Sequence, residues 1–135
     1  MSQENVERVH RIVDAMNRGD LEGVLAHMHP DVEGIPRLLG VEGGGSYHGR
    51  EGIRQWWESI HSAFPDFNAT VLEDRIVADA TISKIRFQGT GAGSGVPFED
   101  TIWMVMRWRD GMIVWSKSYA EAERAEAFEA VGLSE

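Results

Sequence analysis

The stretch over residues 17–33 constrains the fold more than any other part of the chain. It predicts the end of one helix, a sharp corner, a short second helix and the start of a strand. Gly19 suits the left-handed residue just past a helix C-terminus, and Asp20 suits the N-cap of the helix that follows. Because Pro30 cannot continue a helix, we expect the chain to turn into a strand at Val32.

Hydrophobic spacing extends this pattern along the chain. Apolar residues at three- and four-residue intervals predict a helix over residues 3–18, and Ile53, Trp56 and Ile60 belong to a second such pattern over residues 50–63. The dipeptide Asp110-Gly111 predicts a hairpin between two apolar runs. The other expected elements are a short helix at 21–28, a strand at 32–39, a loop at 40–49, strands at 68–77, 81–88, 101–109 and 112–119, and a helix at 121–131.

This order of elements indicates a single α+β domain over residues 1–135. Helices and strands are segregated along the chain, which favours helices packed on one face of an antiparallel sheet. If the sheet is curved, its concave face and the long first helix would enclose a cavity.

Composition excludes several classes of partner. The 135 residues carry 22 acidic and 13 basic side chains, for a net charge of -9, and only Lys84 and Lys117 are lysines. Phosphate neutralisation needs clustered Lys and Arg, so we expect neither nucleic acid nor a membrane surface as a partner. The chain has no cysteine, no apolar run near the ~20 residues that span a bilayer, and no apolar signal region after Met1. We therefore expect a cytoplasmic protein.

Several motifs together resemble one known family. They are the 17–33 stretch, YHGREGIR at 47–54 with the following tryptophans, FPD at 64–66, RDGMIV at 109–114 and EAFEAVGL at 126–133. In these pieces the chain resembles the nuclear transport factor 2-like superfamily, and within it the SnoaL-like branch. The resemblance implies the cystatin/nuclear transport factor 2-like cone, a strongly curved, mainly antiparallel sheet wrapped around a long N-terminal helix. That superfamily hosts isomerases, polyketide cyclases, epoxide hydrolases and dehydratases, so the fold does not imply one activity.

The acid–base residues of well-known members are missing from the matching positions. Where ketosteroid isomerase-like members carry a base, a Tyr and an oxyanion-hole Asp, this chain has Gly34, Ile12 and Met104. These residues cannot move a proton. SnoaL-like cyclases carry an acidic residue on the last strand, and by this resemblance the matching position here is Ser118, with Ser116 two residues earlier. The Asp-Arg-Asp set of limonene-epoxide-hydrolase-like members is also absent.

Aromatic and sulfur-containing side chains indicate a pocket for a hydrophobic small molecule. Strand alternation places Met104, Met106 and Trp108 on one face. Together with Trp57 they could stack against an apolar or aromatic ligand, or they could simply fill the core. The candidate ligand-binding residues are Ile12, Met16, Gly34, Arg37, Trp56, Trp57, Ser83, Met104, Met106, Trp108, Ser116 and Ser118.

Three residues near the expected mouth of the cavity are candidate catalytic groups. Tyr47 and His48 precede the helix at 50–63, and a histidine there could act as a general acid or base. The alternative is that His48 is an exposed loop residue or caps the helix. Glu99, with Asp100 beside it, could supply an acid at the rim, or the two could be the solvated start of a strand.

No metal or other cofactor is expected. His27 and His29 are poorly spaced to share an ion on one helix. The glycine-rich segment at 89–95 leads into a strand and has no lysine, unlike a phosphate loop, so we expect a hairpin there. Arg37 could clamp a carboxylate or an enolate, or form a salt bridge at the rim.

Two functions remain open for the cavity. The first is an enzyme, such as an isomerase, cyclase, dehydratase or hydrolase, that acts on a hydrophobic small molecule. The second is a ligand-binding or structural module without chemistry. In either case the outward-facing Trp103, Trp115 and Tyr119 would leave a large apolar patch on the convex face, so we predict a homodimer through that face.

Overall fold

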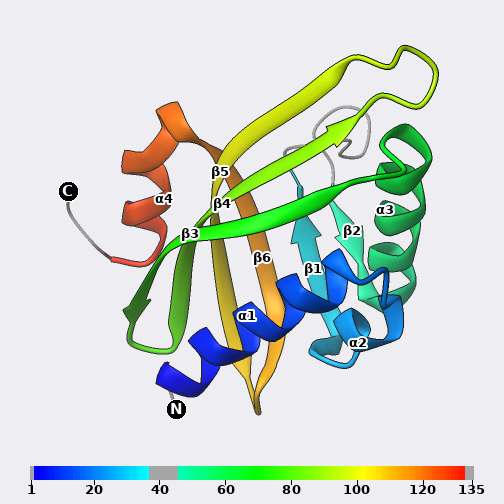
Figure 1. Ribbon diagram of the computed structural model, residues 1–135. Helices are drawn as coiled ribbons and strands as arrows, with labels where there is room; N and C mark the ends of the chain where they lie inside the picture. Colours follow the sequence, from blue (N-terminus) through cyan, green and yellow to red (C-terminus); the bar gives the residue numbers. More distant parts are fainter. Residues whose placement is uncertain (1, 37–45, 133–135) are drawn as a thin grey trace.

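The computed structural model describes residues 2–36 and 46–132. Its elements, in chain order, are α1 (Ser2–Asn17), α2 (Leu21–Leu25), β1 (Met28–Ile35), β2 (Tyr47–His48), α3 (Gly49–Ala63), β3 (Asn68–Val77), β4 (Ala80–Thr90), β5 (Pro97–Arg109), β6 (Met112–Ala120), the 3-10 helix η1 (Glu121–Glu123) and α4 (Arg124–Ala130) (Figure 1).

Within these residues six strands form one sheet in the order β2-β1-β6-β5-β4-β3. Strands β1 and β6 run parallel, and every other neighbouring pair is antiparallel. Helices α1 and α3 cover the face that we call the inner face, and α4 lies against the opposite, outer face (Figure 1). The α+β cone expected from the sequence is thus confirmed.

Two turns predicted from local sequence are also confirmed. Gly19 has a φ of +72°, and the Asp20 side chain accepts a hydrogen bond from the Gly23 N–H at an N···O distance of 2.9 Å. At the tip of the β5–β6 hairpin, Asp110 and Gly111 have φ values of +51° and +76°. Positive φ at both central residues is what a type I′ turn requires.

The prediction for the first strand is wrong in its start. The chain is already extended at Met28, four residues before Val32. Pairing with β6 decides this, since the Ile113 N–H donates to the carbonyl oxygen of His27 at 2.8 Å. Pro30 lies where the β1–β6 register shifts, so its missing N–H interrupts a strand and does not end a helix.

The segment expected to be a loop before α3 contains a strand. Tyr47 pairs with Gly34, and His48 pairs with Glu33, so that β2 extends the sheet beyond β1. This pairing places Tyr47 beside Gly34 at the edge of the sheet, a position that the sequence alone did not predict.

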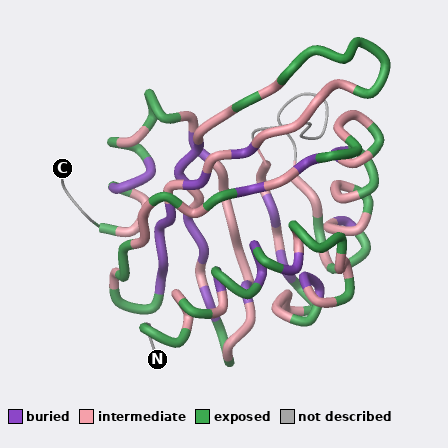
Figure 2. Tube along the Cα trace, viewed as in Figure 1, coloured by how far each residue is buried: buried purple, intermediate pink, exposed green. Residues whose placement is uncertain are grey.

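Helices cover both faces of the sheet, so the prediction of an exposed aromatic patch on the convex face is wrong. Trp103 and Tyr119 are only 2% and 6% exposed, because α4 packs over them. The ring of Phe128 on α4 lies edge-on to Trp103, with 5.1 Å between ring centroids. Trp115 is half-buried at the edge of the same cluster. The buried stretches of β5 and α4 are visible in Figure 2. The reason for predicting a homodimer through this face no longer holds.

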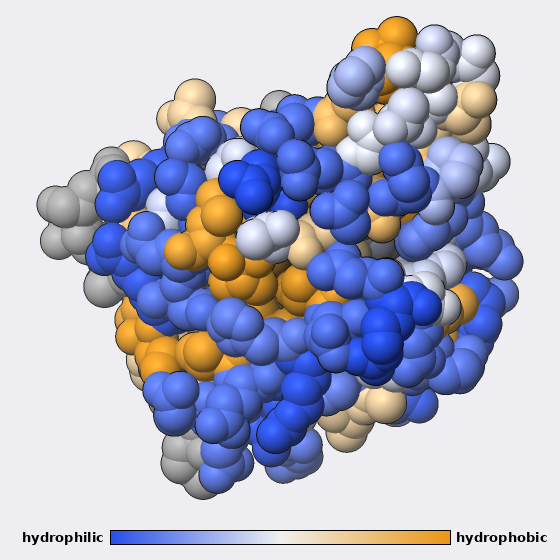
Figure 3. All heavy atoms as spheres, viewed as in Figure 1, coloured by the Kyte–Doolittle hydropathy of each residue, from blue (hydrophilic) through white to orange (hydrophobic). Residues whose placement is uncertain are grey.

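The face seen in Figure 3 is mostly hydrophilic, with hydrophobic atoms gathered where β3 passes α1. Leu72 and Ile76 of β3 are 45% and 39% exposed, and Val96 in the β4–β5 connection is 60% exposed.

In the part of the chain that the structure describes, every helix is too short or too polar to cross a bilayer.

Candidate functional site

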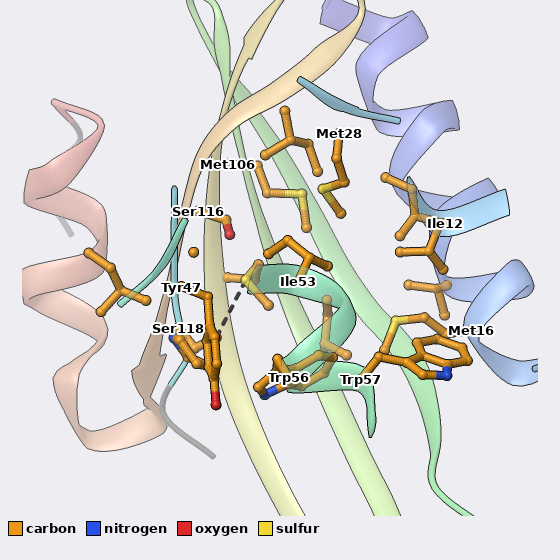
Figure 4. A pocket seen from close by; sticks show the side chains of 18 of the residues that line it. Ile12, Met16, Met28, Tyr47, Ile53, Trp56, Trp57, Met106, Ser116 and Ser118 are labelled. Carbon is orange, nitrogen blue, oxygen red and sulfur yellow. Dashed lines mark hydrogen bonds between the residues drawn. The ribbon is translucent and has the colours of Figure 1, made fainter. Parts of the chain in front are cut away.

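A cavity of about 100 Å³ lies between the inner face of the sheet, α1 and α3 (Figure 4). Its wall is almost entirely apolar, and seven helices and strands besides the short α2 contribute to it. The lining residues in the described part of the chain are Ile12, Val13, Met16, Val24, Met28, Gly34, Ile35, Pro36, Tyr47, Ile53, Trp56, Trp57, Ile85, Phe87, Ile102, Met104, Met106, Ile113, Ser116 and Ser118.

The helical part of the wall follows from helical periodicity. In α3 the lining residues Ile53, Trp56 and Trp57 are three and four positions apart, and Ile60, fully buried, continues the same stripe. Residues at this spacing share one face of a helix. The buried Ile60 holds α3 against the sheet, so the two indoles of α3 are presented to the cavity.

Alternation along the strands supplies the opposite part of the wall. Ile102, Met104 and Met106 of β5 all line the cavity, as expected for every second residue. Trp108 continues this row, but it lies outside the lining because its indole Nε1–H donates to Thr81 Oγ1 at 3.0 Å. At 7% exposed it fills the space beneath α1.

Ser83 also lies outside the cavity lining. Its hydroxyl donates to Asp74 Oδ1 at 2.8 Å, and Asp74 Oδ2 lies 2.7 Å from His10 Nε2 on α1. Ser83 is fully buried in this contact. These contacts hold α1 against β3 and β4. Buried hydroxyls in proteins usually have a hydrogen-bond partner, so the role of Ser83 here is structural.

The polar groups of the wall are hydroxyls and indole N–H groups. Ser116 and Ser118 come from β6, and Tyr47 comes from β2. The Ser118 hydroxyl donates to Met104 Sδ at 3.4 Å. In its described part the wall carries no side chain of Asp, Glu, His, Lys or Arg. A charged ligand would therefore lose its hydration there without an ionic partner.

The other candidate residues at the mouth have separate places. His48 is exposed, and its Nε2 lies 3.0 Å from Ser46 Oγ, with no side-chain cap on α3. Glu99 is exposed and accepts a hydrogen bond from Gln88 Nε2 at 3.1 Å. Arg37 lies outside the described residues.

Asp100 differs from Glu99 because neighbours on a strand face opposite sides of the sheet. It is half-buried, pairs with Phe87 and stands two residues before Ile102 on β5. Since both of these apolar residues line the cavity, the Asp100 carboxylate lies on the inner face in the row next to the cavity wall.

A shallow polar depression of about 340 Å³ lies near the β4–β5 connection, apart from the cavity. Its Asp66 carboxylate accepts hydrogen bonds from the Thr90 backbone N–H at 2.7 Å and from Thr90 Oγ1 at 2.8 Å. These two bonds lower the pKa of Asp66 below its ordinary value. On the outer face, burial raises the pKa of Tyr119, and the nearby Glu126 raises it further.

Several lining residues were missed by the sequence analysis. Met28, Ile53 and Phe87 carry no polar signal, and their spacing is that of any buried helix or strand position.

The two histidines considered for a metal make local contacts. His27 Nδ1 lies 3.1 Å from the Gly23 carbonyl oxygen, and His29 Nδ1 accepts a hydrogen bond from the Asp31 N–H at 3.0 Å.

Solved structures with the same architecture include proteins of differing proposed activity. IdmH from Streptomyces antibioticus, a proposed polyketide cyclase, is 26% identical, with 87% of this chain and 92% of IdmH aligned at a TM-score of 0.75. AclR from Streptomyces galilaeus, a proposed hydroxylase, is 21% identical over 90% of this chain and 91% of its own, with a TM-score of 0.73. An NTF2-like protein of unknown function from Burkholderia pseudomallei K96243 is 20% identical over 95% and 97%, with a TM-score of 0.76.

No curated protein matches the sequence significantly. The sequence model of the SnoaL-like domain matches residues 9–116, which include the second half of α1, the whole of α3 and of β1 to β5, and the cavity-lining Ser116. The resemblance stated from the motifs is thus confirmed over most of the chain. The chain belongs to the SnoaL-like domain family.

Proposed function

We propose that this protein binds a flat, uncharged and largely apolar small molecule in the cavity between α1, α3 and the sheet. The observation that carries the proposal is the lining itself, in which aromatic, aliphatic and thioether side chains surround a few hydroxyl groups. Small-molecule sites have this character, with a mostly hydrophobic wall and a few placed polar groups.

The cavity volume sets the size of the ligand. An apolar cavity of ~150 Å³ holds benzene, so the space of about 100 Å³ found here admits a single ring when the side chains of the wall adjust slightly. A larger ligand would require side chains to move. Met16, Met28, Met104 and Met106 line the cavity, and methionine adapts its shape readily because it is unbranched and has three rotatable bonds.

The binding proposal is tested by thermal unfolding with single- and double-ring aromatic probes. A bound ligand stabilises the folded state by mass action, by ~2.7 kcal/mol at a concentration 100 times its Kd. We expect small uncharged aromatics to raise the melting temperature and aromatic carboxylates to have no effect.

Two variants show where the probes bind. Met104→Phe adds volume to the wall and should abolish the shift, whereas Leu72→Phe changes a residue that is 45% exposed on β3 and should retain it. The proposal is wrong if no aromatic probe shifts the wild-type protein, or if the two variants respond alike.

A second candidate function, acid–base catalysis, is favoured by the position of Asp100. Its carboxylate lies beside the lining residues Phe87 and Ile102, where it could take a proton from a carbon next to a ligand carbonyl. The likeness to IdmH, a proposed polyketide cyclase, is consistent with such chemistry. This function adds a reaction to the binding proposed above.

The catalytic candidate is tested with cyclohexanone, whose α-hydrogens exchange with D2O when a base removes them. Nuclear magnetic resonance should show faster exchange with the wild-type protein than with buffer, and Asp100→Asn should remove the acceleration. Glu99→Gln is the matched control on the other side of β5 and should leave it unchanged. Exchange at the buffer rate would rule out this activity toward a simple ketone.

A further inference from the structure

A notch in the cavity wall lies where Gly34 of β1 faces Ser116 of β6. The two residues are register partners in the parallel β1–β6 pair, and both line the cavity. Figure 4 shows the Ser116 oxygen among apolar side chains of the wall. A single hydroxyl in such surroundings is the kind of polar group that orients a ligand.

The Ser116 hydroxyl differs from the hydroxyls of Ser83 and Ser118 because it has no partner among the residues that the structure describes. Ser118 donates to Met104 Sδ, and Ser83 donates to Asp74. Ser116 makes no hydrogen bond to any side chain or backbone group of the described residues, and it is half-buried. The hydroxyl is therefore available to a ligand, and a ligand that bonds to it keeps its own polar atom hydrogen-bonded within an otherwise apolar wall.

Gly34 keeps the space in front of this hydroxyl open. A methyl group at Gly34 would lie 3.7 Å from Ser116 Oγ and 3.2 Å from Ile53 Cδ1, so it would occupy the notch. The Gly34 backbone has no positive φ that would itself call for glycine. Glycine within a strand reduces stability, and it often marks a place where another group approaches the backbone closely.

We propose that the Gly34–Ser116 notch holds one uncharged oxygen atom of the ligand, a phenolic hydroxyl or a conjugated carbonyl, hydrogen-bonded to Ser116 Oγ. This inference rests on the proposed function and narrows its ligand class to aromatic molecules with an oxygen at one edge. The lack of charged side chains in the described wall favours a neutral oxygen over a carboxylate. The apolar remainder of the wall contacts the rest of the ligand.

The test compares ligands that differ only in a hydroxyl and a methyl group. The pairs are phenol with toluene and 2-naphthol with 2-methylnaphthalene, measured by calorimetric titration. The quantity of interest is the ratio of the two dissociation constants within a pair, compared between wild type and variant. This comparison cancels differences in the hydration of the free ligands.

In Ser116→Ala we expect the preference for the hydroxyl ligand to fall about three- to tenfold, the range of one neutral hydrogen bond. Ser59→Ala is the control, since Ser59 is an exposed serine of α3 outside the cavity lining, and it should leave the preference unchanged. Gly34→Ala should lower the preference as Ser116→Ala does, although its serine is intact. Thermal unfolding without ligand checks that each variant is folded, and Ser116→Cys is the second variant if alanine is not tolerated.

The two proposals fail in different ways. If wild-type protein binds the probes but Ser116→Ala and Ser116→Cys keep the full preference for the hydroxyl, the notch is not the oxygen site while ligand binding stands. If wild-type protein binds no member of either pair, both the cavity function and the notch are contradicted.

Discussion

Replacing Phe128 by alanine tests whether α4 belongs to the outer face of the sheet. The Phe128 side chain is only 1% exposed and lies edge-on to Trp103, with 5.1 Å between ring centroids. The guanidinium carbons of Arg75 and Arg124 lie 5.1 and 4.8 Å from the centre of the Phe128 ring. Removing the ring therefore removes an apolar contact, an aromatic pair and two cation–π contacts at once.

The expected loss is about 3–5 kcal/mol of unfolding free energy, the usual cost of truncating a buried phenylalanine. Helix α4 has seven residues, too few to be stable alone in water. Its position depends on packing against the sheet, and partial collapse of α4 onto the space left by Phe128 favours the lower end of that range. Even ~3 kcal/mol is a large share of the ~5–15 kcal/mol that stabilises a typical domain.

Urea unfolding followed by tryptophan fluorescence measures this loss as a lower transition midpoint. Leu72→Ala is the control, since Leu72 is 45% exposed and a surface change should alter stability by less than ~0.5 kcal/mol. If Phe128→Ala costs less than ~1 kcal/mol, α4 does not hold the outer face. The aromatic residues beneath it would then be open to a second copy of the chain, as the sequence alone led us to expect.

Three further outcomes follow from the described contacts. Asp20→Ala should cost about 1 kcal/mol in thermal unfolding because the Gly23 N–H loses its acceptor, and Asp20→Asn should retain most of the stability. The lowered pKa of Asp66 means that its bonds to Thr90 stabilise the fold above the unfolded-state pKa near 3.9 and are lost as the pH falls through the folded value. In urea unfolding the advantage of wild type over Asp66→Asn should therefore shrink below about pH 4, and a constant difference would contradict this. Trp103 is only 2% exposed, so Trp103→Glu should unfold the chain, which circular dichroism would detect. If light scattering instead shows that the wild-type protein is a dimer and that this variant is a folded monomer, the interface predicted from the sequence is correct.

Local features were predictable because neighbouring residues decide them. The corner at Gly19 and Asp20 depends on a φ preference and on one local hydrogen bond, and the turn at Asp110 depends on φ preferences. The stripe of α3 that lines the cavity follows from helical spacing in the same way. These features require no knowledge of what packs against them.

The start of β1 was not predictable from its own residues. The run that contains Pro30 has the composition of a helix end, and only the pairing of Met28 with Ile113 on β6 extends it. The outer face was missed for a related reason, since strand alternation places Trp103 opposite the cavity without showing that α4 returns to cover it.

The difference between core and cavity wall is likewise a tertiary one. Met104 and Trp108 stand on the same face of β5 with the same periodicity, yet only Met104 lines the cavity. Trp108 is held by Thr81 on the neighbouring strand. Gly34 and Ser116 are 82 positions apart in the printed sequence and become neighbours through the parallel pairing of β1 with β6.

The sequence by itself therefore determined the order of helices and strands, the family and the apolar character of the inner face, because these depend on local preferences and on periodicity. The tertiary structure decided which apolar side chains fill the core and which line the cavity, which face α4 covers, and which wall hydroxyl has no hydrogen-bond partner among the described residues. Those properties depend on the distances between elements, and only packing of the whole sheet against α1, α3 and α4 sets these distances.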